Sequence, residues 1–261
     1  MLLSKDRLYV HIPVCRLIEF LDKHLPLMLN AEIYLDSEFI DNHSNKHIDL
    51  IKSYFEKSGL SKRTHGPFID LNPGSSDRQI RQKTAERFMA ALQLCGKLQS
   101  ESMVLHTHFE PIFYRNHFDE WLKNSCQVWD RLLDEALKKK ISIFIENSIE
   151  TDTRAVSAIL KKYPYFGACF DVAHHNVFNP KGWKAAMEEY PLGSIKEVHL
   201  SDNNGDEDSH MPLGDGSIQF EELFNEIARR KENPIFTIEP HSQDGLDKSL
   251  GFIKRFMNED R

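Results

Sequence analysis

Side chains of the kind that bind metals are concentrated in one loop, Val198–Gly216, which reads VHLSDNNGDEDSHMPLGDG. A short apolar strand is expected to end near His199, and the polar loop that follows contains Asp208 and His210. Because these two residues are two apart, in an extended segment their side chains point to the same side. Imidazole and carboxylate together suit zinc, manganese or a similar divalent ion. Taken alone, the loop is also compatible with a solvated acidic loop containing a chance histidine.

Similar side chains recur where the other predicted strands end. Six consecutive predicted strands, the third to the eighth, each deliver at least one such residue. Together with the loop they give nine candidate ligands: His65, His106, Glu146, Asp171, His174, His199, Asp208, His210 and Glu239. A single histidine at a strand end is usually a hydrogen-bonded core or loop residue, but this recurrence favours a metal site. His108 and His175 are neighbouring alternatives to His106 and His174.

The elements that must position these residues are eight short strands alternating with eight helices. The expected strands are Leu8–Val14, Ala31–Leu35 (which carries Glu32), Thr64–Ile69, Ser102–His106, Ile141–Glu146, Phe166–Phe170, Glu197–Leu200 and Ile235–Ile238. The expected helices are Cys15–Leu29, Asn45–Lys57, one from Ser76 or Asp77 to Leu98, Phe118–Lys139, one from Thr151 or Asp152 to Lys162, Gly182–Tyr190, Ile218–Arg230 and Asp244–Met257. Strict alternation implies parallel strands joined by right-handed crossovers.

The length of 261 residues fits one domain, a single (β/α)8 TIM barrel spanning residues 1–261. The sequence has no G-x-G-x-x-G after the first strand, which argues against a dinucleotide-binding open sheet. In a closed barrel the active site is built at the C-terminal ends of the strands, where the candidate ligands are expected.

Composition narrows the class of protein further. The chain is 40% hydrophobic and 28% charged, and it shows neither a membrane-length apolar run nor a signal-peptide pattern. Its four cysteines are scattered, so we expect them to be reduced and mostly buried in a cytoplasmic protein without a membrane partner. The net charge of −7 disfavours nucleic acid only weakly, because three divalent ions would bring it to about −1. The oligomeric state is left open.

The motifs around the candidate ligands resemble those of the xylose isomerase-like barrel superfamily, which includes sugar isomerases, epimerases and the endonuclease IV family. The resemblance covers nearly the whole chain. It is carried by His65-Gly-Pro-Phe, His106 after Met103-Val-Leu, Glu146-Asn147, Asp171-Val-Ala-His174, His199-Leu-Ser-Asp202, Asp208-Ser-His210 leading to Gly214-Asp-Gly216, and Glu239.

The two branches of this superfamily imply different uses of the same residues. Resemblance to endonuclease IV implies three zinc ions: one on His65, His106 and Glu146, a second on Glu146, Asp171, His199 and Glu239, and a third on His174, Asp208 and His210. Resemblance to the isomerases and epimerases implies one manganese, magnesium or cobalt ion on Glu146, Asp171, His199 and Glu239. The loops Thr107–Glu110 and Asn147–Glu150 depart from the DNA-contacting loops of endonuclease IV.

We therefore expect a metal-dependent enzyme with one to three divalent ions per chain, zinc or manganese first. The favoured activity is isomerase- or epimerase-type proton transfer by Glu146 and Glu239 on a small anionic or polyhydroxylated substrate, such as a sugar or sugar phosphate. The aromatic residues Phe68, Phe109, Phe178 and Trp183 either exclude water from this site or simply pack beneath the loops.

Two alternatives remain. One is hydrolysis of abasic DNA by an endonuclease IV-like phosphodiesterase, for which Arg115, Lys123 and Arg154 are the nearest basic candidates. The acidic Glu110 and Glu150 oppose that path. The other alternative is a non-catalytic barrel that uses metal only to bind a ligand.

Overall fold

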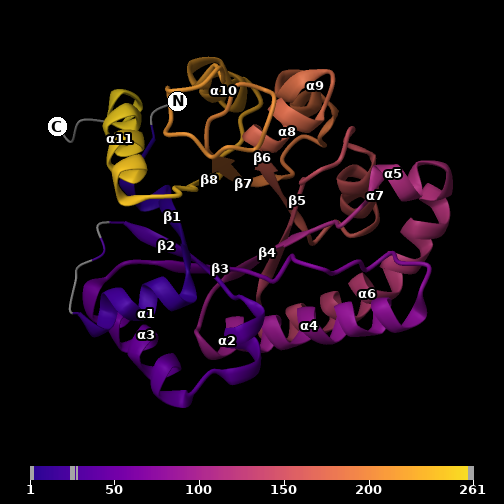
Figure 1. Cartoon of the computed structure of the whole chain (residues 1–261), viewed down its shortest axis with the longest axis horizontal. Coiled ribbons are helices and arrows are strands. Elements are labelled where there is room, and N and C mark those ends of the chain that lie inside the picture. The colour runs from indigo at the N-terminus through magenta and orange to yellow at the C-terminus, as the bar shows by residue number, and fades with distance from the viewer. Residues whose placement is uncertain (1–2, 24–26, 28, 258–261) are drawn as a thin grey trace.

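The computed structural model describes residues 3–23, 27 and 29–257, which form a closed barrel of eight strands surrounded by helices (Figure 1). The strands are β1 (Leu8–Pro13), β2 (Asn30–Tyr34), β3 (Lys62–His65), β4 (Ser102–His106), β5 (Ser142–Glu146), β6 (Gly167–Asp171), β7 (Ile195–Leu200) and β8 (Ile235–Ile238). Each strand pairs in parallel with the next, and β8 closes the ring on β1. The predicted single (β/α)8 architecture is confirmed.

The helices connect successive strands and cover the outside of the barrel. They are α1 (Val14–Asp22), α2 (Ser37–Asn42), α3 (Asn45–Ser58), α4 (Arg78–Lys97), α5 (Pro111–Tyr114), α6 (Phe118–Lys139), α7 (Arg154–Lys162), α8 (Val172–Phe178), α9 (Gly182–Glu189), α10 (Phe220–Arg229) and α11 (Gln243–Ile253), with 3-10 turns at Lys5–Arg7, Arg115–His117 and Lys254–Phe256. The expectation of eight helices is wrong, because α2, α5 and α8 are additional short helices in the loops that follow β2, β4 and β6.

Several predicted boundaries need correction. β3 ends at His65 rather than Ile69, because Pro67 has no N–H to continue the strand ladder. The first helix is described only to Asp22, and residues 24–26 and 28 of the expected span lie outside the described residues. The last helix ends at Ile253 and continues as a 3-10 turn instead of reaching Met257.

The predicted helix caps were partly right. Asp77 caps α4, since its carboxylate accepts hydrogen bonds from the backbone N–H groups of Gln79 (2.7 Å) and Ile80 (3.4 Å). The residue before α7 is Thr153, whereas Thr151 or Asp152 was expected. Asp152 still contributes, because its carboxylate accepts from the N–H of Arg154 at 3.0 Å.

The main hydrophobic core lies between the barrel wall and the helices, where outward-facing strand residues such as Ile33, Leu105 and Ile145 are fully buried. A much smaller apolar cluster consists of Val104, Phe144 and Cys169, residues that alternate with these outward-facing ones. Inward-facing positions of the barrel are thus largely occupied by polar groups, which leaves its C-terminal mouth available for chemistry.

Two compositional predictions bear on this fold. Cys95, Cys126 and Cys169 are buried and Cys15 is exposed, so the cysteines are mostly buried as expected. Within the part of the chain that the structure describes, none of the helices combines the length and apolarity needed to cross a lipid bilayer.

Candidate metal centre

The nine predicted ligands all lie at the C-terminal mouth of the barrel. Strand register explains part of their convergence, because His106 pairs with Glu146 across β4 and β5, and Asp171 pairs with His199 across β6 and β7. The loop after β7 then brings Asp208 and His210 back over the mouth.

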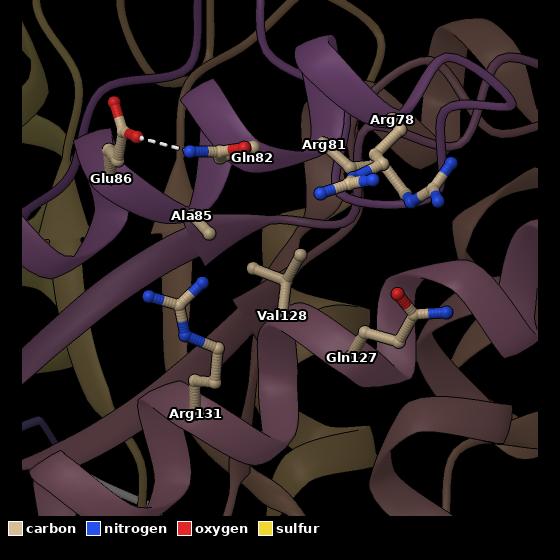
Figure 2. Close-up of a pocket in the computed structure, with 8 residues that line it drawn as sticks. All are labelled: Arg78, Arg81, Gln82, Ala85, Glu86, Gln127, Val128 and Arg131. Carbon is tan, nitrogen blue, oxygen red and sulfur yellow. Dashed lines mark hydrogen bonds between the residues drawn. The ribbon is translucent and has the colours of Figure 1, made fainter.

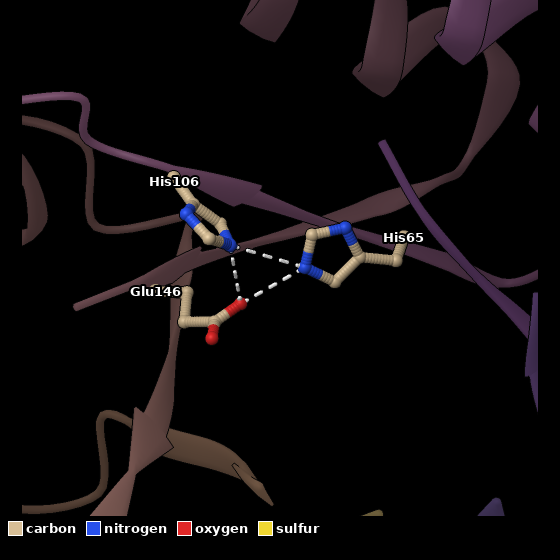
Figure 3. A group of neighbouring side chains, drawn as sticks. All are labelled: His65, His106 and Glu146. Carbon is tan, nitrogen blue, oxygen red and sulfur yellow. Dashed lines mark hydrogen bonds and ion pairs between the residues drawn. The ribbon is translucent and has the colours of Figure 1, made fainter. Parts of the chain in front are cut away.

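The first group consists of His65, His106 and Glu146 (Figure 3). The Nε2 atoms of the two histidines lie 3.0 and 3.1 Å from Oε2 of Glu146, and 3.3 Å from each other. The other ring nitrogen of His65 is 2.8 Å from the carbonyl oxygen of Gly66, which fixes the ring. The ring of Phe68 stacks on that of His106 at 5.0 Å with an angle of 9°. Three ligand atoms thus converge on one point shielded by an aromatic ring.

The second group forms around His199. Its Nδ1 lies 3.3 Å from Oε1 of Glu146 and 3.1 Å from Oε1 of Glu239. Asp171 is fully buried beside it, and its Oδ1 caps α8 by accepting the N–H of His174 at 2.6 Å. Glu146 is shared with the first group, since its two oxygens face different histidines.

The third group joins the short helix α8 to the loop after β7. Oδ2 of Asp208 lies 3.3 Å from Nε2 of His174 and 3.3 Å from Nε2 of His210. His174 is oriented by a 2.9 Å contact between its Nδ1 and the carbonyl oxygen of Asn147. His210 adopts φ of 46°, a left-handed conformation that is uncommon outside glycine, and its ring stacks on His241 at 4.3 Å.

The donor set fits divalent cations. Among the described residues, Asp171 Oδ2 and Asp208 Oδ1 are buried without a hydrogen-bond partner. Such groups are costly to bury unless something compensates them. The first of these atoms belongs to the second group, and the other belongs to the third group. Nitrogen and carboxylate oxygen donors at this spacing suit zinc or manganese.

The ionisable side chains at the mouth lie close enough together to shift one another's pKa values. Burial raises the pKa of Glu146, but the nearby His106 and His199 outweigh it and hold this pKa well below the usual range. In the same way, His199 outweighs burial and lowers the pKa of Glu239 to about 2. Burial, reinforced by Glu239 and Glu146, raises the pKa of Asp171 to about 7. Glu146 and Glu239 are therefore ionised near neutral pH, which is the form that binds a cation.

The two spare histidines differ from the candidate ligands in their contacts. His175 is buried against Phe170, with its Nε2 3.2 Å from the hydroxyl of Tyr190, and burial lowers its pKa to about 3. The ring of His108 lies 5.8 Å from that of Phe88 on α4 and 5.7 Å from that of His106, but it is His106 that contacts Glu146, at 3.1 Å. The geometry therefore groups His106 and His174, rather than their neighbours, with the other candidates.

The loops after β4 and β5 are tied together by Glu150. Its carboxylate accepts hydrogen bonds from the hydroxyl of Thr107 and from the N–H of Ser148, and it is 1% exposed. The expectation that Glu150 repels an approaching nucleic acid is wrong in this respect, because the side chain is a buried link between loops. Among the four aromatic residues, Phe68 borders the first group and Phe178 lies 6.2 Å from the ring of His174. Phe109 and Trp183 pack in the core.

Sequence reasoning missed several residues of the mouth. His11 of β1, Glu32 of β2 and Glu239 have ligand-type atoms within 4.8 Å of one another, as do Glu146, Cys169 and His199. Glu32 was noted on its strand but was not assigned to the site. The available signal was the alternation of side-chain direction along β1 and β2. It turns His11 and Glu32 to the inside of the barrel, where the two residues pair in register.

One surface cavity lies beside this centre, and another lies on the outside of the barrel. One of about 530 Å³ runs beside the mouth between β1 and α11, and its lining includes His11, Pro240 and His241 over an apolar floor. Another, of about 300 Å³, lies on the outside of the barrel between α4 and α6, where Arg78, Arg81 and Arg131 gather (Figure 2). It contains none of the nine candidate ligands, so it is not the site that the sequence predicts.

Comparisons with known proteins agree with this architecture. A family profile described as "Xylose isomerase-like TIM barrel" matches residues 29–256. An uncharacterized protein of Methanocaldococcus jannaschii is 26% identical over 223 residues, which is 82% of this chain and 76% of that protein. A D-tagatose 3-epimerase-like protein superposes with a TM-score of 0.79 at 22% identity, over 95% of this chain and 96% of the other. Endonuclease IV from Thermus thermophilus superposes with a TM-score of 0.67 at 16% identity, over 96% and 98% of the two chains. At these identities the structural likenesses establish a shared fold.

Proposed function

The chain belongs to the xylose isomerase-like TIM barrel family, and from this premise we propose that it is a divalent-metal-dependent enzyme that transfers a proton on a small, oxygen-rich substrate. Sugars, sugar phosphates and related polyols are the substrate class. The observation that carries the proposal is the approach of two carboxylates, Glu146 and Glu239, to the same nitrogen of His199.

The inner ion would be held by Glu146, Asp171, His199 and Glu239. When bound, such an ion polarises a carbonyl group and its neighbouring hydroxyl, which makes the adjacent carbon more acidic. Glu146 and Glu239 come from β5 and from the loop after β8, so they reach the mouth from different sides of the ring. One carboxylate is placed to remove a proton from carbon and the other to return one.

The surrounding residues prepare Glu146 for this role. His65 and His106 both contact its Oε2, which leaves Oε1 facing the inner group. Phe68 covers His106 and limits access of water on that side. The side chain of Glu239 is 10% exposed, more than that of Glu146, so it is the carboxylate closer to the open mouth.

The second candidate is endonuclease IV-like cleavage of abasic DNA. The observation in its favour is the separate third group, His174, Asp208 and His210, which proton transfer on a sugar does not require. Against it, the guanidinium of Arg154 is paired with Asp152 at 3.0 Å and lies over the ring of Phe118. That basic candidate is thus already engaged and does not offer its charge freely to a phosphate backbone.

The test is a panel of ketoses, aldoses and their phosphates, incubated with the zinc- or manganese-loaded protein in deuterated water. We expect carbon-bound deuterium to appear in at least one sugar, and at least 100-fold less of it with Glu146→Gln or Glu239→Gln. Glu150→Gln, which alters another buried carboxylate after β5, is the matched control and should retain exchange. An abasic oligonucleotide is assayed in parallel. Its cleavage by the wild type, lost in Glu146→Gln, would reject proton transfer in favour of the second candidate.

A further inference from the structure

Glu32 links two histidines across the inside of the barrel. It is fully buried on β2, where it pairs in register with His11 of β1. Its Oε1 lies 3.0 Å from Nδ1 of His11, and its two oxygens lie 3.3 and 3.4 Å from Nε2 of His199 on β7. A single carboxylate thus contacts one histidine of the mouth and one candidate ligand of the inner ion.

The contact with Glu32 suits one way of binding an ion through His199. A carboxylate beside Nε2 favours the tautomer in which Nε2 carries the hydrogen and donates it. On the other side of the ring, Nδ1 faces Glu239 at 3.1 Å and Glu146 at 3.3 Å. An ion held by these carboxylates would take the lone pair of Nδ1 and leave the hydrogen on Nε2, where Glu32 can receive it. The ring is therefore presented to the carboxylates through the nitrogen that a cation needs.

Another buried carboxylate nearby, Glu197, is less well placed for this role. Its Oε1 lies 3.8 Å from Nε2 of His199, farther than either oxygen of Glu32, and it accepts the hydroxyl of Thr237 at 2.5 Å. Glu197 is also fully buried and lies two residues before His199 on the same strand. It therefore provides a matched comparison: the same residue type and burial, but a weaker contact with the histidine.

We propose that Glu32 is a positioning residue for the inner ion: it receives the Nε2–H of His199 when Nδ1 binds the cation, and it orients His11 beside that ring. This inference rests on the proposed function in one respect, the binding of a divalent ion by His199. A carboxylate that receives the second N–H of a metal-bound histidine fixes both the ring and its tautomer, and loss of such a partner typically weakens metal binding 10- to 100-fold.

The experiment measures zinc and manganese binding by competition with a chromogenic chelator, together with ion content per chain at buffered free metal. Glu32→Gln keeps the size of the side chain but replaces the acceptor with an amide that can turn either group toward the histidine. We expect one ion per chain to bind about 10- to 100-fold more weakly in this variant. Glu197→Gln should stay within about threefold of the wild type. If Glu32→Gln does not fold, Glu32→Asp, which withdraws the carboxylate by one methylene, should show the same selective loss.

A spectroscopic readout separates positioning from general destabilisation. In zinc-loaded protein labelled with ¹⁵N-histidine, His199 should have a protonated Nε2 and a metal-bound Nδ1, and Glu32→Gln should change the Nε2 resonance more than Glu197→Gln does. His11→Ala tests whether the effect passes through His11 instead. A loss of affinity in that variant equal to the loss in Glu32→Gln would overturn the role assigned through His199.

The outcomes for this inference and for the proposed function differ. Equal metal affinity in Glu32→Gln and the wild type, or equal losses in Glu32→Gln and Glu197→Gln, would overturn the inference alone. A wild type that binds metal with the predicted Glu32 dependence, but exchanges no sugar proton, would reject the proposed activity and support the inference. A wild type that binds neither ion would overturn both.

Discussion

Asp202 is the residue on which the loop of the third group depends most directly. It is fully buried, and its carboxylate accepts four backbone N–H groups: those of Asn203 (2.9 Å) and Ile218 (3.1 Å) on Oδ1, and those of Gly214 and Gly216 (2.9 Å each) on Oδ2. The loop that returns to Asp202 carries Asp208 and His210. Removing the carboxylate should therefore destabilise the protein and weaken the third group together.

The glycines of this loop are explained by the same carboxylate. A Cβ at Gly216 would lie 2.4 Å from Oδ1 of Asp202, so the backbone can approach only without a side chain. Gly214 has φ of 90°, a conformation that side chains rarely adopt. The motif Gly214-Asp-Gly216 is thus the turn that delivers two N–H groups to Asp202.

The size of the effect follows from these bonds. A hydrogen bond to a charged acceptor contributes about 1.5–3 kcal/mol, so four independent and fully buried bonds would give about 6–12 kcal/mol. Gly214 and Gly216 are not buried, so water can replace their acceptor after mutation. Counting mainly the bonds to Asn203 and Ile218, we expect Asp202→Ala to lower the free energy of unfolding by about 3–6 kcal/mol. Asp202→Asn keeps one carbonyl oxygen and should lower it by about 2–3 kcal/mol.

The assay is urea unfolding of chelator-treated protein, followed by measurement of bound zinc per chain in folded samples. Asp206→Asn is the control, because this exposed residue of the same loop accepts only the N–H of Glu207 and its substitution should cost less than about 0.5 kcal/mol. The reasoning is refuted if Asp202→Ala costs less than about 1 kcal/mol, or if Asp206→Asn costs as much.

Two further predictions concern the third group. The double variant Asp208→Ala with His210→Ala should bind one ion fewer per chain while the inner ion remains, as measured by mass spectrometry of the metal content; unchanged stoichiometry would mean that the loop holds no ion. In metal-free protein, burial lowers the pKa of His210, but the hydrogen bond with Asp208 and the charges of Glu239, Asp208 and Asp171 outweigh it and raise this pKa to about 9. Because this lies above the unfolded value of about 6.5, its stabilising contribution is complete below about pH 6.5 and is lost as the pH rises through about 9. Zinc requires neutral histidine, so the difference in melting temperature between zinc-loaded and chelated protein should widen over this range, and a constant difference would contradict the coupling.

The fold and most of the candidate centre were predictable because both depend on local patterns. Parallel strands place their C-terminal residues on one rim, so His106, Glu146 and Asp171 could be assigned to the same mouth from strand order alone. The core strand β4 and the helix α6 were predicted with the bounds that the structure has. In both elements the spacing of apolar residues is uninterrupted. At the ends of each, polar residues or a change in that spacing mark the boundary.

The errors have physical causes that a one-dimensional pattern does not carry. Glu32 and His11 lie within their strands and not at the strand ends where the other candidates were found, yet they reach Glu239 and His199 inside the barrel. Glu150 looks exposed in sequence because its neighbours are polar, yet it is buried and accepts a hydrogen bond from the hydroxyl of Thr107. The short helix α8 was missed, although Asp171, a candidate ligand, is also its N-cap.

The arrangement of charge explains why so many ligand-type residues are compatible with a stable barrel. The mouth concentrates buried carboxylates, and each would be costly to bury without a compensating positive charge. Without metal, protonated histidines supply that positive charge. Burial disfavours protonation of His65, His174 and His199, yet the carboxylates outweigh burial and raise all three pKa values. A divalent ion and these protons compete for the same nitrogen atoms. Ion binding should therefore replace protons as the charge that offsets the buried carboxylates, which couples the integrity of the mouth to the ion that the proposed reaction needs.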